Sequence, residues 1–478
     1  MTSTSAATNT IEDLRPAIES AGQSHVLAFM DELDGAEAAA FLQQLSAIDW
    51  AALPGIIERY RGAGSVEPGG DLEPPVVSCP SGTPGDVAID ADRARAAGLE
   101  LLRERKVAAL TVAGGQGTRL GFDGPKGTLP IGPASGRTLF EVFADQIAAA
   151  STWSQRPIPW LVMTSPLNHG QTLRFFEERD WLGLEREQVR FFVQGVMPSF
   201  CPDTGRLLLA DKGALATNPD GHGGVVRALA RSGELERLER EGVEHLSYFQ
   251  VDNPLVPPID PVFLGAHVGA GGAPSSGEFS SKMVAKAEAT EKVGVFARRG
   301  GRTCVVEYSD LPDELASAMD ASGRLHFEAG SVAIHAASVA FLRSIDEAGE
   351  SALPFHRAFK KVPHLDLDSG QKIEPTEPNG VKLERFVFDA IPVAREPLVM
   401  RVAREREFAP TKNATGVDSV QSAKQLQHDR GVSWLVERGQ RSPQGCTLEL
   451  SGAAAWADVA GLEHVPHATP KPDASVVL

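Results

Sequence analysis

The pattern that most constrains the fold of this chain is an alternation of short apolar segments with amphipathic ones, which begins near residue 95. Four such segments predict buried strands: Val107–Val112, Trp160–Met163, Arg190–Val193 and Leu246–Val251. A helical pattern over Thr138–Ala149 separates the first two. Strands that alternate with helices build parallel sheets, because a parallel connection needs a crossover. We therefore expect an α/β fold, with a mainly parallel sheet flanked by helices.

The segments on either side of this alternation differ from it. Apolar residues follow helical spacing from residue 10 to about residue 60. Gly62–Gly85 is rich in glycine and proline without periodicity, and we expect a linker there. After about residue 400 comes a smaller region that includes the apolar stretch Leu448–Leu462. We therefore expect a helical N-terminal region with its linker over 1–95, a central α/β domain over 96–400, and a small C-terminal domain over 401–478.

Composition narrows the class of protein. The chain has 478 residues, 42% of them hydrophobic, with no run of 18 apolar residues and no signal peptide, so we expect no membrane partner. Its four cysteines, Cys79, Cys201, Cys304 and Cys446, lie far apart, which favours reduced thiols in the cytoplasm. A net charge of −17 argues against a nucleic-acid partner, because binding to a phosphate backbone needs a basic face. A few cations in one cleft can still bind a nucleotide.

The most informative motif follows the first predicted strand. Residues 112–127 read VAGGQGTRLGFDGPKG and contain Arg119 and Lys126. Glycines let backbone N–H groups approach phosphate oxygens, and the two cations add charge. Leu120 stands where the dinucleotide fingerprint needs glycine, which disfavours a nicotinamide oxidoreductase, and the lysine–glycine order of a P-loop is reversed. The loop therefore predicts a polyphosphate site of another kind.

This loop matches the signature G-G-x-G-T-R-(x)n-P-K, and with it the chain resembles the eukaryotic-type UDP-sugar pyrophosphorylase family. The matching landmarks follow one another in family order: Gly114–Gly121, Pro125–Gly127, Pro159–Ser165, Phe191–Gly195, Pro219–Gly224, Val251–Asn253, Val306–Ser309, Pro378–Lys382, Phe386–Asp389 and Lys412–Ala414. They are most similar to the UDP-N-acetylglucosamine pyrophosphorylase branch. The resemblance implies a Rossmann-like nucleotidyltransferase sheet in the central domain. It also implies transfer of a uridylyl group from UTP to a sugar 1-phosphate, with Mg²⁺ as cofactor.

The resemblance also implies where UTP binds. Arg119 and Lys126 match the family's loop cations, and Lys382 and Lys412 match its distal phosphate-binding lysines, so these four are the expected catalytic residues. Asp252 resembles the family's metal-holding aspartate, and Mg²⁺ typically takes one or two carboxylates besides phosphates and water. The expected UTP-binding residues are Val112, Ala113, Gly114, Gly115, Gly117, Thr118, Gln194 and Gly221. The Gln194 amide offers uracil both a donor and an acceptor.

The expected sugar pocket is where the chain departs from the N-acetylglucosamine branch. The residues concerned are His222, Glu307, Tyr308, Glu328, Phe386 and Phe388. The pair Glu307-Tyr308 copies that branch, and the two phenylalanines match aromatics near its N-acetyl group, although they also suit a strand core. His222 instead resembles the UDP-glucose enzymes, and Glu328 and Ser331 replace two asparagines of the N-acetylglucosamine enzymes. We favour N-acetylglucosamine 1-phosphate as the substrate, with glucose 1-phosphate as the alternative.

A second class of function stays open beside the enzyme. A catalytically silent relative would bind a UDP-sugar without converting it, and would be marked by loss of a loop cation or of the aspartate. Arg119, Lys126 and Asp252 are all present, which favours the enzyme. The oligomeric state stays open as well.

Overall fold

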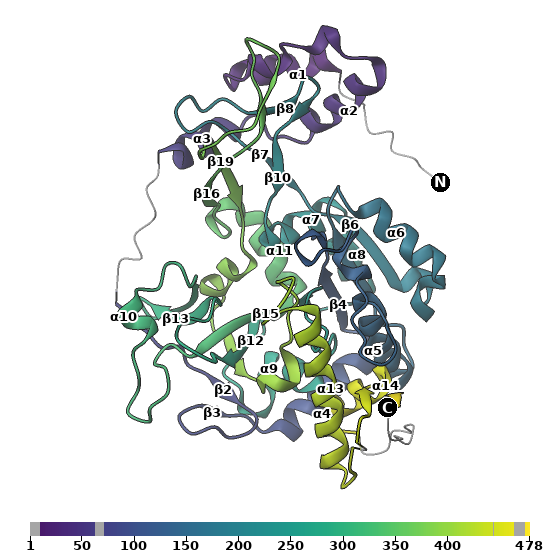
Figure 1. The fold of residues 1–478 in the computed structure, drawn as a ribbon. Coiled ribbons are helices and arrows are strands. Elements are labelled where there is room, and N and C mark those ends of the chain that lie inside the picture. The colour runs from purple at the N-terminus through teal and green to yellow at the C-terminus, as the bar shows by residue number, and fades with distance from the viewer. Residues whose placement is uncertain (1–9, 63–70, 443, 463–473) are drawn as a thin grey trace. The chain divides into compact units, whose positions relative to one another are not determined.

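The computed structural model describes residues 10–62, 71–442, 444–462 and 474–478, which group into two compact units (Figure 1). The first unit joins the N-terminal residues up to Gly69 with Gly195–Gly224 and Pro354–Phe386. The second joins Gly70–Gln194, Val225–Leu353 and Val387–Leu478. The units are thus interleaved along the chain, whereas the regions expected from the sequence are consecutive.

The second unit is built on a twelve-stranded sheet within the described part of the chain. Its main path runs β3 (Val87–Ala88), β2 (Ser78–Cys79), β20 (Leu398–Arg401), β12 (Phe279–Ala285), β15 (Ala329–Ser338), β11 (His245–Gln250), β4 (Val107–Val112), β5 (Trp160–Thr164) and β6 (Val189–Val193). The strands β1 (Leu72–Glu73), β13 (Val295–Arg299) and β14 (Arg302–Val306) pair off this path. The runs β11-β4-β5-β6 and β3-β2-β20-β12 are parallel, and β15 is antiparallel to both neighbours. The predicted α/β fold is confirmed.

Strand β4 shows why this sequence forms a covered sheet. Its residues from Val107 to Leu110 are at most 2% exposed. Val107 and Ala109 belong to one apolar cluster, while Ala108 and Leu110 belong to another, as the alternation of side chains across a strand requires. Both faces of the parallel strands are therefore covered, which explains the continuous apolar runs in the sequence.

Helices cover the two faces of this sheet. One cluster includes residues of α4 (Ala91–Arg103), α5 (Leu139–Ser154), α6 (His169–Glu178), α9 (Pro261–His267) and α14 (Gly452–Ala460), and the other of α7 (Val225–Arg231), α8 (Glu234–Glu241) and α11 (Val339–Ala348). Helix α5 begins at a capping box, in which Thr138 accepts from Glu141 N (3.3 Å) and Glu141 accepts from Thr138 N (2.8 Å). Helices α4 and α9 approach closely: a Cβ on Gly98 would lie 1.9 Å from the Pro261 carbonyl oxygen.

Two segments belong to this unit more closely than their sequences suggested. The expected linker over Gly62–Gly85 was wrong for its described part from residue 71, because β1 pairs with β13 and β2 pairs with β20. At the C-terminal end, α13 (Val420–Glu437), β21 (Thr447–Glu449), α14 and β22 (Ser475–Val477) lie in the same unit. Helix α14 packs on α5, with the Trp456 and Trp153 rings 5.7 Å apart.

The first unit combines the N-terminal helices with two later segments of the chain. The helices α1 (Ile11–Ser20), α2 (Gly35–Ser46) and α3 (Leu53–Arg61) confirm the predicted helical region. They share an apolar cluster with strands from residues 196–219 and 356–384. The strands of these two segments are β7 (Val196–Pro198), β8 (Leu209–Asp211), β9 (Ala214–Leu215), β10 (Thr217–Pro219), β16 (His356–Lys360), β17 (His364–Leu365), β18 (Lys372–Ile373) and β19 (Gly380–Glu384). Those that contribute residues to the cluster are β7, β8, β9, β17 and β19. Gln23 ties the parts together by accepting from Leu207 N (2.9 Å) and donating to Gly205 O (3.1 Å).

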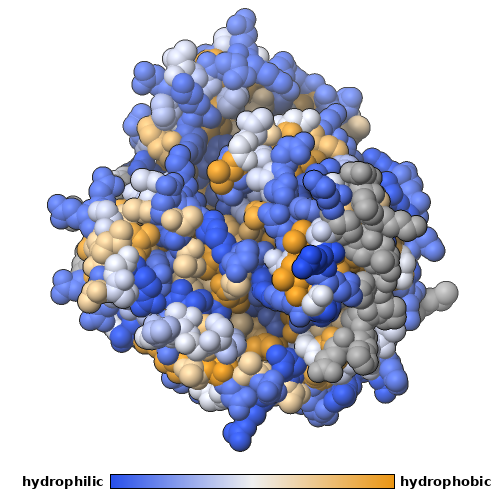
Figure 2. Space-filling view, turned by 60° about the horizontal axis from the view of Figure 1, so that its bottom comes forward, coloured by the Kyte–Doolittle hydropathy of each residue, from blue (hydrophilic) through white to orange (hydrophobic). Residues whose placement is uncertain are grey.

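The face shown in Figure 2 is mainly hydrophilic, with apolar residues in small groups between polar ones. Among the described helices, none combines the length and the apolar character needed to cross a bilayer.

Candidate active site

The glycine loop leaves the carboxyl end of β4 and folds back on itself. Gly117 N donates to Gly124 O (2.9 Å), and Lys126 N donates to Gly115 O (3.1 Å). A Cβ on Gly117 would lie 2.7 Å from the Phe122 ring, and Gly121 has φ +70°, so the loop depends on its glycines at these points.

The loop offers backbone donors to a ligand. Asn168 Nδ2 donates to Ala113 O (2.9 Å) and Gly115 O (3.2 Å), which fixes the loop's carbonyl groups. Within the described part of the chain, the N–H groups of Gly114, Gly115 and Gln116 donate to no other group. Consecutive free N–H groups form a concave anion site. Asn168 was missed from the sequence, because its contact with the loop spans more than fifty residues.

Lys126 and Asp252 meet beside this loop. The strands that precede them, β4 and β11, are parallel neighbours, with Val112 opposite Gln250. Their carboxyl ends therefore share one edge of the sheet, and Lys126 Nζ lies 3.4 Å from Asp252 Oδ2. Both side chains are about one-sixth exposed, at 16% and 15%. The structure thus brings together a loop cation and the expected metal-binding carboxylate.

The residue before Lys412 is hydrogen-bonded to the backbone of Asp252, which brings Lys412 to the candidate site. Thr411 donates to Asp252 O from both N (2.9 Å) and Oγ1 (3.1 Å). Lys412 N donates to Asp418 O (2.6 Å), and its Nζ lies 5.8 Å from the centre of the Phe408 ring. Arg119, in contrast, is exposed and forms no ion pair with any described carboxylate.

Asp418 is a second residue that the sequence did not reveal. It has φ +58°, which is uncommon for a residue other than glycine, and it holds the turn that carries Lys412. Burial raises the pKa of its carboxyl, and the positive charges of Lys412 and Arg404 oppose this increase. An aspartate in a turn is ordinary in sequence, so only its contacts show that it lies close to these cations.

Gln194 lies against the glycine loop from the neighbouring strand end. It follows β6, its N donates to Thr164 O (2.7 Å), and it is 7% exposed. A Cβ on Gly114 would lie 2.8 Å from Gln194 Oε1. The residues Val112, Ala113, Gly114, Gly115, Gly117 and Thr118 thus share one edge of the second unit with Gln194, Lys126 and Asp252.

Four expected site residues belong to the first unit: Gly221, His222, Lys382 and Phe386. Gly221 has φ +84°, and a Cβ there would lie 2.2 Å from Arg385 O, so this close approach requires glycine. His222 stacks on Phe386 at 5.2 Å with an interplanar angle of 21°. Burial and the nearby His356 lower the pKa of His222 to about 4, so the ring is neutral near pH 7. Lys382 lies in β19, opposite Ala358 of β16.

The remaining expected sugar residues lie in the second unit. Glu307 and Tyr308 follow β14, and Tyr308 is 49% exposed. Phe388 lies in the 3₁₀ helix η10 (Val387–Val393) and packs against one apolar cluster of the sheet. The places of these residues in the fold do not test the sugar-binding roles expected of them, and those roles stay predictions.

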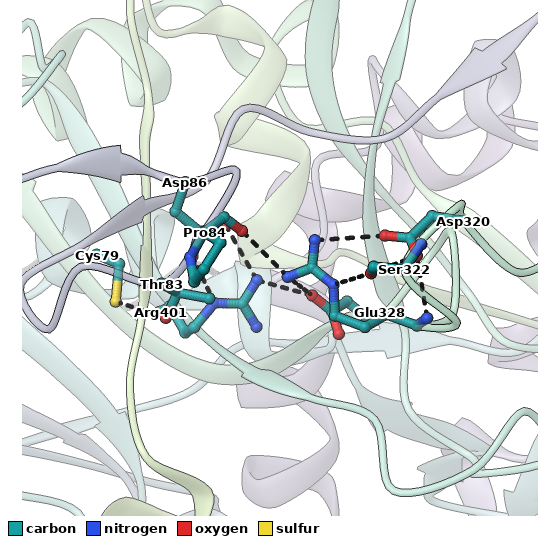
Figure 3. Close-up of polar contacts among 9 residues, drawn as sticks. Cys79, Thr83, Pro84, Asp86, Asp320, Ser322, Glu328 and Arg401 are labelled. Carbon is teal, nitrogen blue, oxygen red and sulfur yellow. Dashed lines mark hydrogen bonds and ion pairs between the residues drawn. The ribbon is translucent and has the colours of Figure 1, made fainter.

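Glu328 has partners of its own (Figure 3). Arg401 Nη2 donates to Glu328 Oε1 (2.8 Å), and Arg324 Nη1 lies 3.7 Å from the same oxygen. Arg401 also pairs with Asp86 at 2.5 Å. Burial lowers the pKa of Arg401, but the two carboxylates more than offset this effect and raise it. The Glu328 carboxylate is therefore engaged by two guanidinium groups, and a sugar hydroxyl would have to compete with them.

Comparisons with known proteins show the family to which this chain belongs. Residues 88–451 match the UTP–glucose-1-phosphate uridylyltransferase family. The chain belongs to this family. It is 37% identical to a UDP-N-acetylhexosamine pyrophosphorylase-like protein 1 of Xenopus tropicalis, over 92% of this chain and 89% of that protein. It is 36% identical to a UDP-N-acetylglucosamine pyrophosphorylase of Saccharomyces cerevisiae, over 75% of this chain and 76% of that one.

Solved structures agree with this assignment. An inhibitor complex of the UDP-N-acetylglucosamine pyrophosphorylase of Trypanosoma brucei matches with a TM-score of 0.78 and 25% identity, covering 94% of this chain and 95% of that one. A UDP-glucose pyrophosphorylase of Leishmania major matches with a TM-score of 0.57 at 18% identity, covering 88% of this chain and 80% of that one. At that identity the second match supports the shared fold alone.

Proposed function

We propose that this member of the family is a uridylyltransferase that converts UTP and N-acetylglucosamine 1-phosphate to UDP-N-acetylglucosamine and pyrophosphate. The observation that carries the proposal is the grouping of the glycine loop, Lys126, Asp252 and Gln194 at the carboxyl ends of β4, β11 and β6. Open α/β sheets bind ligands at this edge. The names of the relatives support the same activity.

The proposed reaction is one nucleotidyl transfer. An oxygen of the sugar phosphate attacks the α-phosphorus of UTP, and the bond from that phosphorus to the departing pyrophosphate breaks. No protein nucleophile is needed, so the work of the chain is to position two anions that repel each other and to offset their charge. The free N–H groups of the loop, Arg119 and Lys126 would hold the triphosphate, and Gln194 would read uracil. Lys412 would bind the sugar phosphate, and the phosphate-binding role expected of Lys382 in the first unit stays a prediction.

Asp252 is the residue that would hold Mg²⁺. Among the described residues no three Asp, Glu, His or Cys side chains cluster as a metal cage. One carboxylate fits Mg²⁺, which keeps much of its water and takes its other ligands from substrate phosphates. The ion would supply charge neutralisation at those phosphates. We also place the reaction in the cytoplasm, in keeping with the four free cysteines.

The choice of sugar rests on the relatives and on the state of Glu328. Relatives named for the N-acetylglucosamine or N-acetylhexosamine reaction match this chain at 36–37% identity. Glu328 replaces an asparagine of the N-acetylglucosamine branch, but its carboxylate is paired with Arg401 and Arg324. The replacement therefore does not by itself argue against N-acetylglucosamine 1-phosphate. The histidine at position 222, which resembles the UDP-glucose enzymes, favours glucose 1-phosphate as the second candidate.

A pyrophosphate-release assay tests the proposal. The purified protein receives UTP, Mg²⁺ and one sugar 1-phosphate from a panel that includes N-acetylglucosamine, N-acetylgalactosamine, glucose and galactose 1-phosphates. We expect the highest kcat/KM with N-acetylglucosamine 1-phosphate. A higher value with glucose 1-phosphate would reverse the sugar assignment alone. Release of no pyrophosphate with any sugar, despite binding of UDP-N-acetylglucosamine, would support the catalytically silent relative instead.

A further inference from the structure

Lys282 is a fully buried cation outside the residues assigned so far. It lies on β12 with its side chain 0% exposed, and its Nζ lies 2.5 Å from Asp260 Oδ2 and 2.6 Å from Glu407 Oε2. Asp260 also caps α9 through its other oxygen, which accepts from Val262 N (2.9 Å) and Phe263 N (3.2 Å). Glu407 is the last residue of the short helix α12 (Arg404–Glu407). The lysine thus fastens α12 to the strand and to the start of α9.

The charges of this ion triad depend on one another. Burial lowers the pKa of Lys282, but Asp260 and Glu407 more than offset this effect and raise it. Burial raises the pKa of Glu407, and Lys282 opposes the increase. A buried ion pair contributes little net stability, yet removal of one partner is costly because a buried charge stays uncompensated. The triad is therefore better explained by the position in which it holds its three elements than by a gain in the stability of the fold.

Glu407 begins a segment that runs to the candidate active site. Asn253, which is 4% exposed, donates from Nδ2 to Glu407 O (2.6 Å) and accepts at Oδ1 from Ala409 N (2.9 Å). Two residues further on, Thr411 donates twice to Asp252 O. Residues 407–411 are thereby fixed alongside residues 252–253, and Lys412 comes next in the chain.

We propose that Lys282 is a positioning residue, which holds Glu407 so that residues 407–411 present Lys412 beside Asp252. Lys282 is itself inaccessible to a substrate, so it acts only through this segment. The inference rests on the proposed uridylyl transfer, because that reaction gives Lys412 and Asp252 their roles. A displacement of about 1 Å at a reacting group can cost about a hundredfold in rate.

A double-mutant cycle tests this action through Lys412. Lys282→Met removes the charge at similar length, and we expect kcat to fall about 10- to 100-fold. In a Lys412→Ala background, the same change should cost less than about threefold, because the residue it positions is already gone. Equal losses in the two backgrounds would overturn the proposal. If Lys282→Met does not fold, Glu407→Gln, which removes the carboxylate that Lys282 holds, enters the same cycle with the same two outcomes.

Hydrogen exchange tests the positioning without any assay of activity. The amides of Ala409 and Thr411 donate to Asn253 and Asp252, so they should exchange at least about tenfold faster in Lys282→Met than in the wild type. The matched control is Lys106→Met, since Lys106 also lies between two carboxylates, Glu104 and Glu244, but on the surface before β4. Unchanged exchange at these two amides would overturn the proposal. If the wild type releases no pyrophosphate, the exchange result still stands, so failure of the proposed reaction and failure of the positioning are separate results.

Discussion

Replacement of Lys126 by alanine tests the candidate site at its centre. The ammonium group lies 3.4 Å from Asp252, and the side chain is only 16% exposed, so solvent screens it incompletely. A phosphate oxygen at about 4 Å would gain roughly 4 kcal/mol from this charge at an effective dielectric constant near 20. Part of that interaction is already present when UTP binds, and only the part that grows in the transition state raises kcat. We expect kcat/KM to fall at least about a hundredfold, equivalent to about 2.7 kcal/mol.

The assay is the initial rate of pyrophosphate release at varied UTP and saturating sugar 1-phosphate. Lys126→Arg keeps the charge and should retain more activity than Lys126→Ala. Thermal unfolding of both variants checks the fold, because loss of a largely buried ion pair partner can itself destabilise the protein. A fall of less than about tenfold in a folded Lys126→Ala protein would refute the role assigned to this lysine.

Four further predictions concern the base, the metal, acid stability and helix packing. Gln194→Ala should lower the preference for UTP over CTP by about tenfold, roughly the effect of one hydrogen bond, and an unaltered ratio would show that the base is read elsewhere. Asp252→Ala should abolish most activity at limiting Mg²⁺, and an unchanged metal titration would contradict its role. Burial and the nearby His245 lower the pKa of His267 to about 3, so the unfolded chain binds this proton first on acidification. The free energy of unfolding should then fall by up to about 1.4 kcal/mol per pH unit below about pH 6.5, and an undiminished slope in His267→Gln would contradict this. Gly98→Ala should destabilise the protein by about 3 kcal/mol, because the new Cβ would lie 1.9 Å from a backbone oxygen of α9. The control Gly170→Ala, on α6, has open space around the new Cβ and should change stability by less than about 1 kcal/mol. Similar values for the two variants would refute the packing argument.

The sheet was predictable because its signal is local. Strands β4 and β5 are short runs that are almost wholly apolar, because burial on both faces makes such runs continuous. Strands β6 and β11 include polar residues but keep apolar residues at half or more of their positions. The short strands β1 and β2 were missed, because two-residue strands in a segment rich in glycine and proline carry no periodicity.

The candidate site divides in the same way. The glycine loop and its cations could be recognised because they follow one another within sixteen residues, 112–127. Asn168 and the Lys282 triad could not, because their residue types are ordinary and their contacts are long-range. Asp418 contacts residues close in the chain, but an aspartate in a turn is too ordinary to single out. Glu328 shows the converse, since the sequence suggested a sugar ligand and the structure gives its carboxylate two arginine partners.

The sequence by itself determined the α/β fold class, the glycine loop with its two cations and the family resemblance, because these depend on side-chain period and on residues close in the chain. Only the tertiary structure decided that Lys126 faces Asp252, since parallel strands β4 and β11 bring residues 126 positions apart to one edge. It also decided which charges are paired before any substrate arrives. The pairing of Glu328 with Arg401, and of Lys282 with Asp260 and Glu407, follows from burial, where a charge without a partner is too costly to keep.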